Sequence, residues 1–287
     1  MAGTPAHAGS PRTCDAPPPL SATQQDRLLR IAALVQELLQ EQAAPAALIA
    51  RSGTDLTRFG ARYSHAAVAL RDDASGRWSV RQLYFDCDAQ QPRLFDQGLA
   101  GFVMGTDDPE SSYVSILKLP ADAAHALRRA ALDRPLVLGL LAADYSANAY
   151  AFSTRYQNCN QWVAELLAAA WAPLTGPPER LRARAQRWLQ DQAYEPTSFE
   201  LRAAVWMDLA RFVPWLHRDD HPAEDLAAAR FRVSMPASLE AFVQRRLAGT
   251  ERVELCHAGD RVVWRRGGRA LADGCRAEPG DRLTRLD

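Results

Sequence analysis

The chain has 287 residues, of which 47% are hydrophobic, so it can form one large domain with a substantial core. Its 34 basic and 34 acidic side chains balance at pH 7, which leaves no basic footprint for binding nucleic acid. No run reaches the roughly 18 apolar residues that a membrane span needs, so no transmembrane segment is predicted.

The first segment, residues 1–20, is rich in Ala, Pro and Gly and is predicted to be a disordered tail. Within it, Ala6-His7-Ala8 is typical of a signal-peptidase site, although the charged and apolar segments of a signal peptide do not precede it. The motif is either the remnant of a signal peptide that starts further upstream or a chance match in an alanine-rich chain.

Residues 21–172 are predicted to form an α+β body with an antiparallel sheet. Ser21-Ala22-Thr23-Gln24 has the form of a capping box and predicts a helix to about Gln42. The following predicted elements are a strand at 47–50, a strand at 60–70, a turn at 72–76, a strand at 78–85, an irregular segment at 86–105, a strand at 113–119, a helix at 121–132 and a helix from 159 to about 171.

Residues 173–287 are predicted to form a C-terminal helical and hairpin extension. Pro173 and Gly176-Pro177-Pro178 end the preceding helix. The predicted elements here are helices at 179–192 and 198–212, a strand at 231–234, a helix at 238–247 and a hairpin of strands at 252–256 and 261–265.

One pair of residues suggests chemistry. Cys159 begins the apolar helix, where the helix N-terminus supplies partial positive charge that favours a thiolate. His65 lies far upstream on a predicted hairpin strand, and an imidazole near the thiol could accept its proton. The alternative is structural: a cysteine at a helix start is often a small buried residue, and a histidine on a strand can be a satisfied core residue.

Other side chains favour no further site. The run from His217 to His221 contains residues of metal-ligand type, but a solvated loop before Pro222 is the preferred interpretation. The cysteine spacings match no zinc pattern, and the chain contains no phosphate loop, dinucleotide fingerprint or HExxH motif, so no cofactor and no metal are expected.

The five cysteines allow two interpretations. Cys256 and Cys275 flank the terminal hairpin and could form a disulfide, and Cys14 could pair with Cys87, which would leave Cys159 free and favour a periplasmic or secreted protein. Alternatively, all five are reduced thiols in a cytoplasmic protein.

Several short motifs together resemble a known group: Arg51-Ser52-Gly53, Tyr63-Ser64-His65, residues 152–162 and Asp219-Asp220-His221-Pro222. A histidine on a strand that precedes a cysteine at a helix start is similar to the circularly permuted branch of NlpC-type papain-like proteins. The wider pattern, over roughly residues 14–247, resembles the bacterial domain of unknown function 2145. The resemblance implies a papain-like α+β core and thioester chemistry at an amide or ester carbonyl.

The resemblance also implies roles for single residues. Cys159 would be the nucleophile, His65 the base, and a polar residue on the neighbouring strand would orient the imidazole. Counting along the hairpin puts residues 82–84 opposite His65, and Gln82 is the amide among them. A glutamine departs from the commoner histidine or acidic partner, because it orients by hydrogen bonding alone. The oxyanion would be held by the backbone N–H of Cys159 and a side-chain donor. The candidate donors are Tyr63, Gln157 and Asn158, and Asn158 could instead be the helix N-cap.

These features predict a cysteine-dependent hydrolase of the cell envelope, acting on a peptide, amide or acyl ester. The alternatives are a non-catalytic envelope-binding protein that retains the fold and, less favoured, an acyltransferase. The glutamine partner and the C-terminal extension, which could cover the groove, favour the binding protein.

Overall fold

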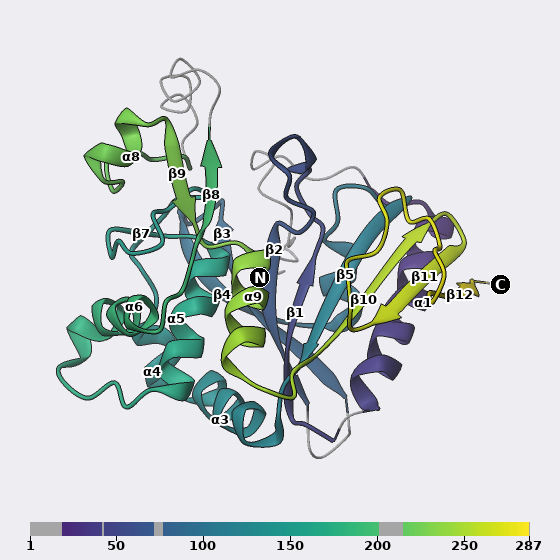
Figure 1. Cartoon of the computed structure of the whole chain (residues 1–287), viewed down its shortest axis with the longest axis horizontal. Helices are drawn as coiled ribbons and strands as arrows, with labels where there is room; N and C mark the ends of the chain where they lie inside the picture. The colour runs from purple at the N-terminus through teal and green to yellow at the C-terminus, as the bar shows by residue number, and fades with distance from the viewer. Residues whose placement is uncertain (1–18, 42, 72–76, 201–214, 287) are drawn as a thin grey trace, which may run out of the picture.

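The computed structural model describes residues 19–41, 43–71, 77–200 and 215–286. Its centre is an eight-stranded sheet in which every paired strand is antiparallel, in the order β12-β11-β10-β5-β1-β2-β3-β4 (Figure 1). The predicted α+β class with an antiparallel sheet is therefore confirmed. The strands of this sheet are β1 (Ala46–Arg51), β2 (His65–Arg71), β3 (Trp78–Asp86), β4 (Gln91–Gly98), β5 (Ser111–Lys118), β10 (Glu251–Ala258), β11 (Arg261–Arg266) and β12 (Arg282–Arg285).

Helices cover both faces of this sheet and make two hydrophobic cores. One core contains side chains of α3 (Ala121–Leu132), α5 (Cys159–Trp171), α6 (Leu181–Asp191) and α9 (Pro236–Arg246), with Val137 of the short α4 (Arg134–Gly139). The other contains side chains of α1 (Ala22–Gln40) and α2 (Leu99–Met104). Figure 1 shows α1 on the opposite side of the sheet from α3, α5 and α9. Because neighbouring side chains of a strand point to opposite faces, Val68 of β2 packs in the first core and Ala67 in the second.

Two small sheets lie outside the main one. Strands β6 (Asp144–Tyr145) and β7 (Tyr156–Gln157) pair in parallel just before α5, and β8 (Thr197–Glu200) pairs antiparallel with β9 (Arg230–Val233). A short helix, α8 (Ala223–Ala227), precedes β9, and single 3-10 turns occupy Thr57–Phe59 and Pro178–Arg180.

Most sequence-predicted elements are confirmed, and the errors have local causes. The capping box at Ser21 opens α1, and α3 and α5 begin at the predicted residues. The segment 86–105, predicted to be irregular, instead forms β4 and α2. Pro92 obscured the strand, but β4 is at the sheet edge, where proline is tolerated. The helix predicted at 198–212 is wrong at its start, because residues 197–200 form the strand β8. The rest of that predicted helix, 201–212, and the turn predicted at 72–76 lie outside the described residues.

The last part of the chain belongs to the central sheet. Strand β10 pairs along its whole length with β5, so residues after 172 contribute strands next to those from before it. The predicted disulfide between Cys256 and Cys275 is confirmed, and Cys87 is also disulfide-bonded. The predicted partner of Cys87, Cys14, lies outside the described residues. Disulfides persist in oxidising compartments, so the bond favours an extracytoplasmic location.

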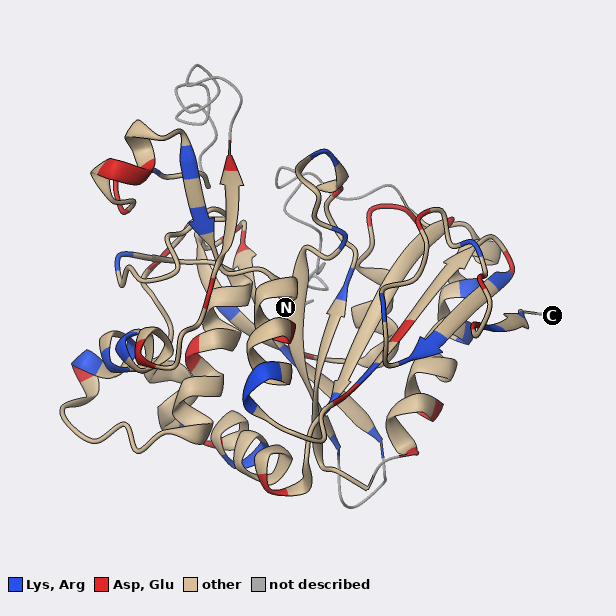
Figure 2. Ribbon diagram, viewed as in Figure 1, with Lys and Arg blue, Asp and Glu red and all other residues tan. Residues whose placement is uncertain are grey.

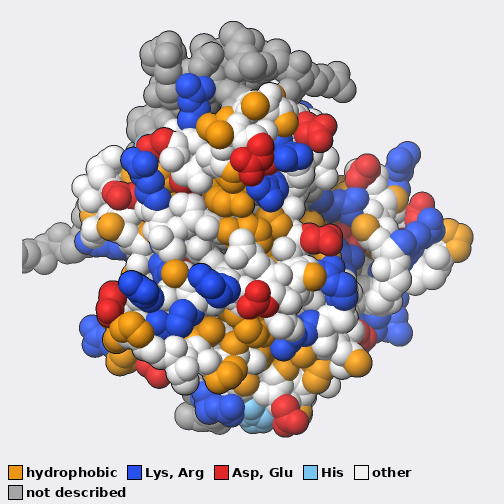
Figure 3. Space-filling view, turned by 60° about the vertical axis from the view of Figure 1, so that its left-hand side comes forward, with side chains coloured by type: hydrophobic (Ala, Val, Ile, Leu, Met, Phe, Trp, Pro, Cys, Tyr) orange, Lys and Arg blue, Asp and Glu red, His pale blue; other side chains and the backbone are white. Residues whose placement is uncertain are grey.

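Charged residues of both signs are spread over helices and strands alike (Figure 2). On the face shown in Figure 3, arginine, acidic and apolar side chains are interspersed. Among the helices of the described residues, none is both long and apolar enough to cross a membrane.

Candidate functional site

Cys159 is the first residue of α5, and its neighbour Asn158 caps the helix. The Asn158 Oδ1 accepts a hydrogen bond from the Gln161 backbone N–H at 2.7 Å, and its Nδ2 donates to the carbonyls of Ala147 at 3.2 Å and Ser234 at 3.4 Å. Asn158 is thus the N-cap that the sequence offered as its alternative role. Its side-chain amide is fully engaged, which leaves it no donor for an oxyanion.

The Cys159 thiol is 8% exposed and is the free cysteine among the described residues. Burial raises its pKa from an ordinary 9.0 to about 12. Three groups oppose that rise: the backbone N–H groups of Asn160 and of Cys159 itself, and the positive charge of Arg51. The helix start therefore supplies the expected polarity, but burial outweighs it, and the thiol is neutral at ordinary pH.

His65 is the first residue of β2, and its contacts fix its tautomer. Its Nε2 lies 2.8 Å from the Gln82 Oε1, as hairpin counting predicted for this pair. Because an amide oxygen only accepts, Nε2 carries the proton and the lone pair lies on Nδ1. The ring stacks on Tyr84 with centroids 4.7 Å apart. Burial, followed by the charge of Arg51, lowers the pKa of His65 to about 3, so the imidazole is neutral.

Asn160 joins the start of α5 to the strand that carries His65. Its Oδ1 accepts from the Ala66 backbone N–H at 2.8 Å, and its Nδ2 donates to the Ser64 carbonyl at 3.1 Å. These backbone groups flank His65 on both sides. The residue after Cys159 is therefore bonded directly to the residues before and after His65, which puts the two predicted site residues in one neighbourhood.

The two side chains reach this neighbourhood from opposite faces of the sheet. Cys159 belongs to the core under α5. His65 shares the alternation of Ala67 and Ala69, and its ring lies 6.1 Å from that of Phe102 in the other core. Strands β2 and β3 pair at residues 68–71 but not at 65–67, while β2 stays paired with β1 as far as His65. The Asn160 side chain lies at this opening, where it bonds to the backbone on both sides of His65.

Arg51 is a component of the site that the sequence did not identify. It ends β1 directly opposite His65 and is 2% exposed. Its Nη2 donates to the Tyr84 hydroxyl at 2.9 Å, and the guanidinium carbon lies 5.5 Å from the centroid of the Phe102 ring. Its charge acts on both Cys159 and His65. The sequence signal was Arg51-Ser52-Gly53, one of the short motifs of the family pattern, to which no role at the site was assigned.

The other two oxyanion candidates are bonded elsewhere. The Tyr63 hydroxyl donates to Glu254, and burial raises its pKa well above the ordinary value. The Gln157 Nε2 donates to the Leu140 carbonyl at 2.8 Å and to Glu165 at 2.7 Å. Neither side chain has a donor left for Cys159. The backbone N–H groups of Cys159 and Asn160 lie within hydrogen-bonding reach of the thiol.

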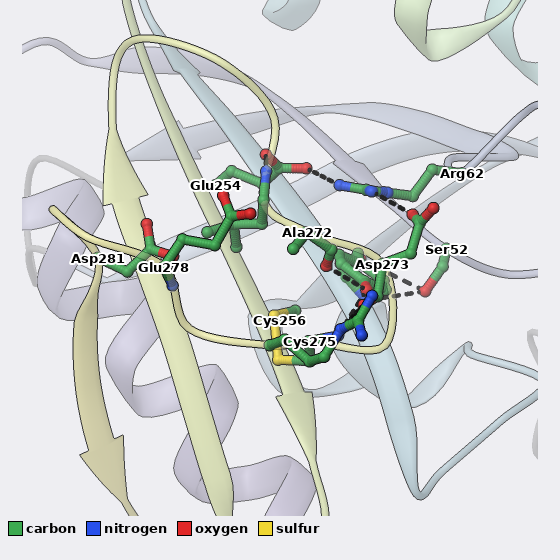
Figure 4. Close-up of a disulfide and its surroundings, with 12 residues drawn as sticks. Ser52, Arg62, Glu254, Cys256, Ala272, Asp273, Cys275, Glu278 and Asp281 are labelled. Atoms are coloured by element: carbon green, nitrogen blue, oxygen red, sulfur yellow. Dashed lines mark hydrogen bonds and ion pairs between the residues drawn. A yellow bond between two sulfur atoms is a disulfide. The ribbon is translucent and has the colours of Figure 1, made fainter.

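The C-terminal hairpin braces the loop that leads into β2 (Figure 4). Arg62 donates to Glu254 at 3.0 Å and to Asp273 at 2.6 Å, and Glu254 also accepts from the Leu271 backbone N–H at 2.7 Å. The Cys256–Cys275 disulfide closes the segment that carries Leu271 and Asp273. The hairpin therefore fixes residues 62 and 63, just ahead of His65.

The run from His217 to His221 is a loop, as predicted, but only part of it is solvated: Arg218 and Asp219 are exposed, whereas the side chains of Asp220 and His221 are both 0% exposed. Asp220 Oδ2 accepts from the Tyr150 backbone N–H at 2.9 Å, and His221 Nε2 lies 2.8 Å from the Asn148 carbonyl oxygen. The pair holds the loop that precedes Cys159. Within the described part of the chain, no group of three or more His, Cys, Asp or Glu is arranged to hold a metal.

A family profile described as "Uncharacterized protein conserved in bacteria (DUF2145)" matches residues 38–243. The chain belongs to this family. The match includes Arg51, His65 and Cys159, and it ends before the disulfide-bonded hairpin. A search of curated proteins and a search of solved structures each found no match.

Proposed function

We propose that this DUF2145 protein is a cysteine-dependent hydrolase of amides or esters, with Cys159 as nucleophile, His65 as base and Gln82 as orienting residue. The observation that carries the proposal is the pair of Asn160 hydrogen bonds, which join the residue after Cys159 to both neighbours of His65. A helix N-terminus set against a histidine-bearing strand, with the histidine first in the chain, supports a permuted papain-like fold.

The chemistry follows from the hydrogen bonds. The Sγ of Cys159 attacks the carbonyl carbon while its proton passes to the free Nδ1 of His65. The backbone N–H groups of Cys159 and Asn160 stabilise the oxyanion. The imidazolium returns the proton to the leaving amine or alcohol, and a thioester remains. Water, activated by His65, then releases the carboxylic acid and restores the thiol.

The extracytoplasmic location favoured by the disulfide makes a cell-envelope peptide or acyl ester the expected substrate. Since the thiol and the imidazole are both neutral at rest, charge develops only during the reaction, when a bound substrate has excluded water from the site.

A second candidate is a binding protein that retains this fold. The observation that favours it is the burial of both groups, since Cys159 is 8% and His65 6% exposed, and each pKa is shifted away from the ion pair of an active thiol enzyme.

The test is a search for Cys159-dependent turnover. A panel of acyl esters and envelope-derived peptides would be incubated with wild type, Cys159→Ser, His65→Gln and His125→Gln. The mass of the intact protein would be measured by mass spectrometry during turnover. His125 is the matched control because it is an exposed histidine on α3. We expect hydrolysis and an acyl adduct on Cys159 in wild type and His125→Gln, and loss of hydrolysis in Cys159→Ser and His65→Gln. Equal ligand binding by wild type and Cys159→Ser with no turnover would support the binding protein instead.

A further inference from the structure

Arg51 is a buried cation for which the described residues provide no carboxylate. It is 2% exposed, its hydrogen bonds go to the Tyr84 hydroxyl at 2.9 Å and the Ser52 carbonyl at 3.4 Å, and its buried Nε has no partner. The titratable groups of the described residues that interact with it are His65 on β2, Tyr84 on β3 and Cys159 on α5, and none of them carries a carboxylate.

The other buried arginine of the described residues, Arg182, and the part-buried Arg252 are both paired with carboxylates. Arg182 lies 2.8 Å from Glu165, and Arg252 lies 2.8 Å from Glu240 and 2.9 Å from Glu254. A buried charge without a partner costs several kcal/mol, whereas a paired one recovers much of that cost. Arg51 therefore differs from Arg182 and Arg252 in having no carboxylate partner among the described residues. A negatively charged ligand would supply that partner.

The fold makes room for this guanidinium. A Cβ atom at Gly53 would lie 2.6 Å from the Arg51 Nη1, and one at Gly105 would overlap Nη2. Neither glycine has a positive φ, so the backbone conformation does not require glycine at either position. A side chain at either position would meet the Arg51 head group, which would then have to move. Two glycines from different loops thus define a slot that holds the guanidinium beside His65.

We propose that Arg51 binds a carboxylate group of the ligand of this site. A guanidinium presents parallel N–H donors that match a planar carboxylate, and the donor on Nε is free. The Tyr84 hydroxyl accepts from Arg51, so its own proton is available to a second carboxylate oxygen. This inference rests on the proposed function and names its substrate class: an amide or ester that carries a carboxylate close to the scissile carbonyl.

The experiment compares a charged probe with its neutral counterpart. Thermal denaturation would be followed with N-acetylglycine and N-acetylalanine and with their amides, which have nearly the same shape but no charge. The proteins are wild type, Arg51→Gln, Cys159→Ser and the control Arg58→Gln, which changes an exposed arginine. We expect at least one acid to raise the Tm of wild type, Cys159→Ser and Arg58→Gln in a concentration-dependent way, and its amide to have no effect.

In Arg51→Gln we expect affinity for the acid to fall at least about tenfold, as for the loss of a charge-assisted hydrogen bond. We also expect its ligand-free Tm to be no lower than that of wild type, because an unpaired buried charge has been removed. Equal effects of acid and amide, a shift retained in Arg51→Gln, or no shift with either acid would overturn the proposal. Acid binding that requires Arg51 in a protein without turnover would refute only the hydrolase.

Discussion

Asn160→Ala tests the connection on which the candidate site depends. The substitution removes the acceptor of the Ala66 N–H and the donor to the Ser64 carbonyl, two hydrogen bonds of 2.8 and 3.1 Å. The Asn160 side chain lies in the interior, with the residue 2% exposed, and Ala66 is 0% exposed, so water does not replace either bond without rearrangement.

A buried polar group left without a partner costs about 1–3 kcal/mol, so the two together should lower the free energy of unfolding by about 2–6 kcal/mol. That is a large part of the roughly 5–15 kcal/mol that stabilises a typical domain. The measurement is urea denaturation with linear extrapolation, in which the midpoint should fall while the slope stays constant. Gln190→Ala, an exposed amide on α6, is the control and should change stability by less than about 0.5 kcal/mol.

A loss below about 1 kcal/mol for Asn160→Ala would refute the reasoning, because it would mean that Asn160 does not bridge α5 and β2 in solution. The isosteric variant Asn160→Asp separates the contributions of the two hydrogen bonds. It retains the acceptor for the Ala66 N–H and loses the donor to the Ser64 carbonyl. Near pH 7 it also buries a negative charge, so its stability should recover as the pH falls and the carboxyl becomes protonated.

Three further predictions concern ionisation and the disulfide. Because the Cys159 pKa is about 12 rather than 9.0, its alkylation by iodoacetamide at pH 8, read by mass spectrometry, should be about 1000-fold slower than that of an ordinary thiol, and a midpoint below pH 9 would contradict this. The unfolded state protonates His65 below about pH 6.5 and the folded state only near pH 3, so stability should fall as the pH drops through that window. Between pH 7 and 4, wild type and His125→Gln should therefore lose about 3 kcal/mol more than His65→Gln in denaturant titrations, and equal losses in all three would exclude a neutral buried imidazole. Replacing both Cys256 and Cys275, which are 19 residues apart, by serine should cost about 3 kcal/mol of unfolding free energy, and an unchanged midpoint would show that the disulfide does not constrain the chain.

The features that were predictable from the sequence are those fixed by near neighbours in the chain. The Asn158 cap depends on residues three positions apart, and counting back from one turn limits the partner of His65 to residues 82–84, of which Gln82 makes the hydrogen bond. In both cases the chain itself limits where the partner can lie, so a local pattern carries the information.

The features that were missed depend on distant segments. Nothing near Asn160 indicates that its amide bonds to residues 64 and 66, because the opening between β2 and β3 is a property of the whole sheet. The burial of Arg51 likewise follows only once α2 and Gly105 pack against β1. The position of β10 beside β5 joins segments more than a hundred residues apart, and no local pattern specifies it.

Arg51 and Gln82 together determine how a reaction at this site would be controlled. The glutamine provides no negative charge to stabilise an imidazolium, and burial, followed by the charge of Arg51, lowers the pKa of His65. A carboxylate bound to Arg51 would neutralise that cation and remove part of the penalty for protonating His65. If His65 is the base and Arg51 binds the carboxylate, a substrate with a carboxylate makes His65 a stronger base as it binds, and an uncharged analogue does not. The expected signature is a lower kcat for the neutral analogue than for the acid, in addition to any change in KM.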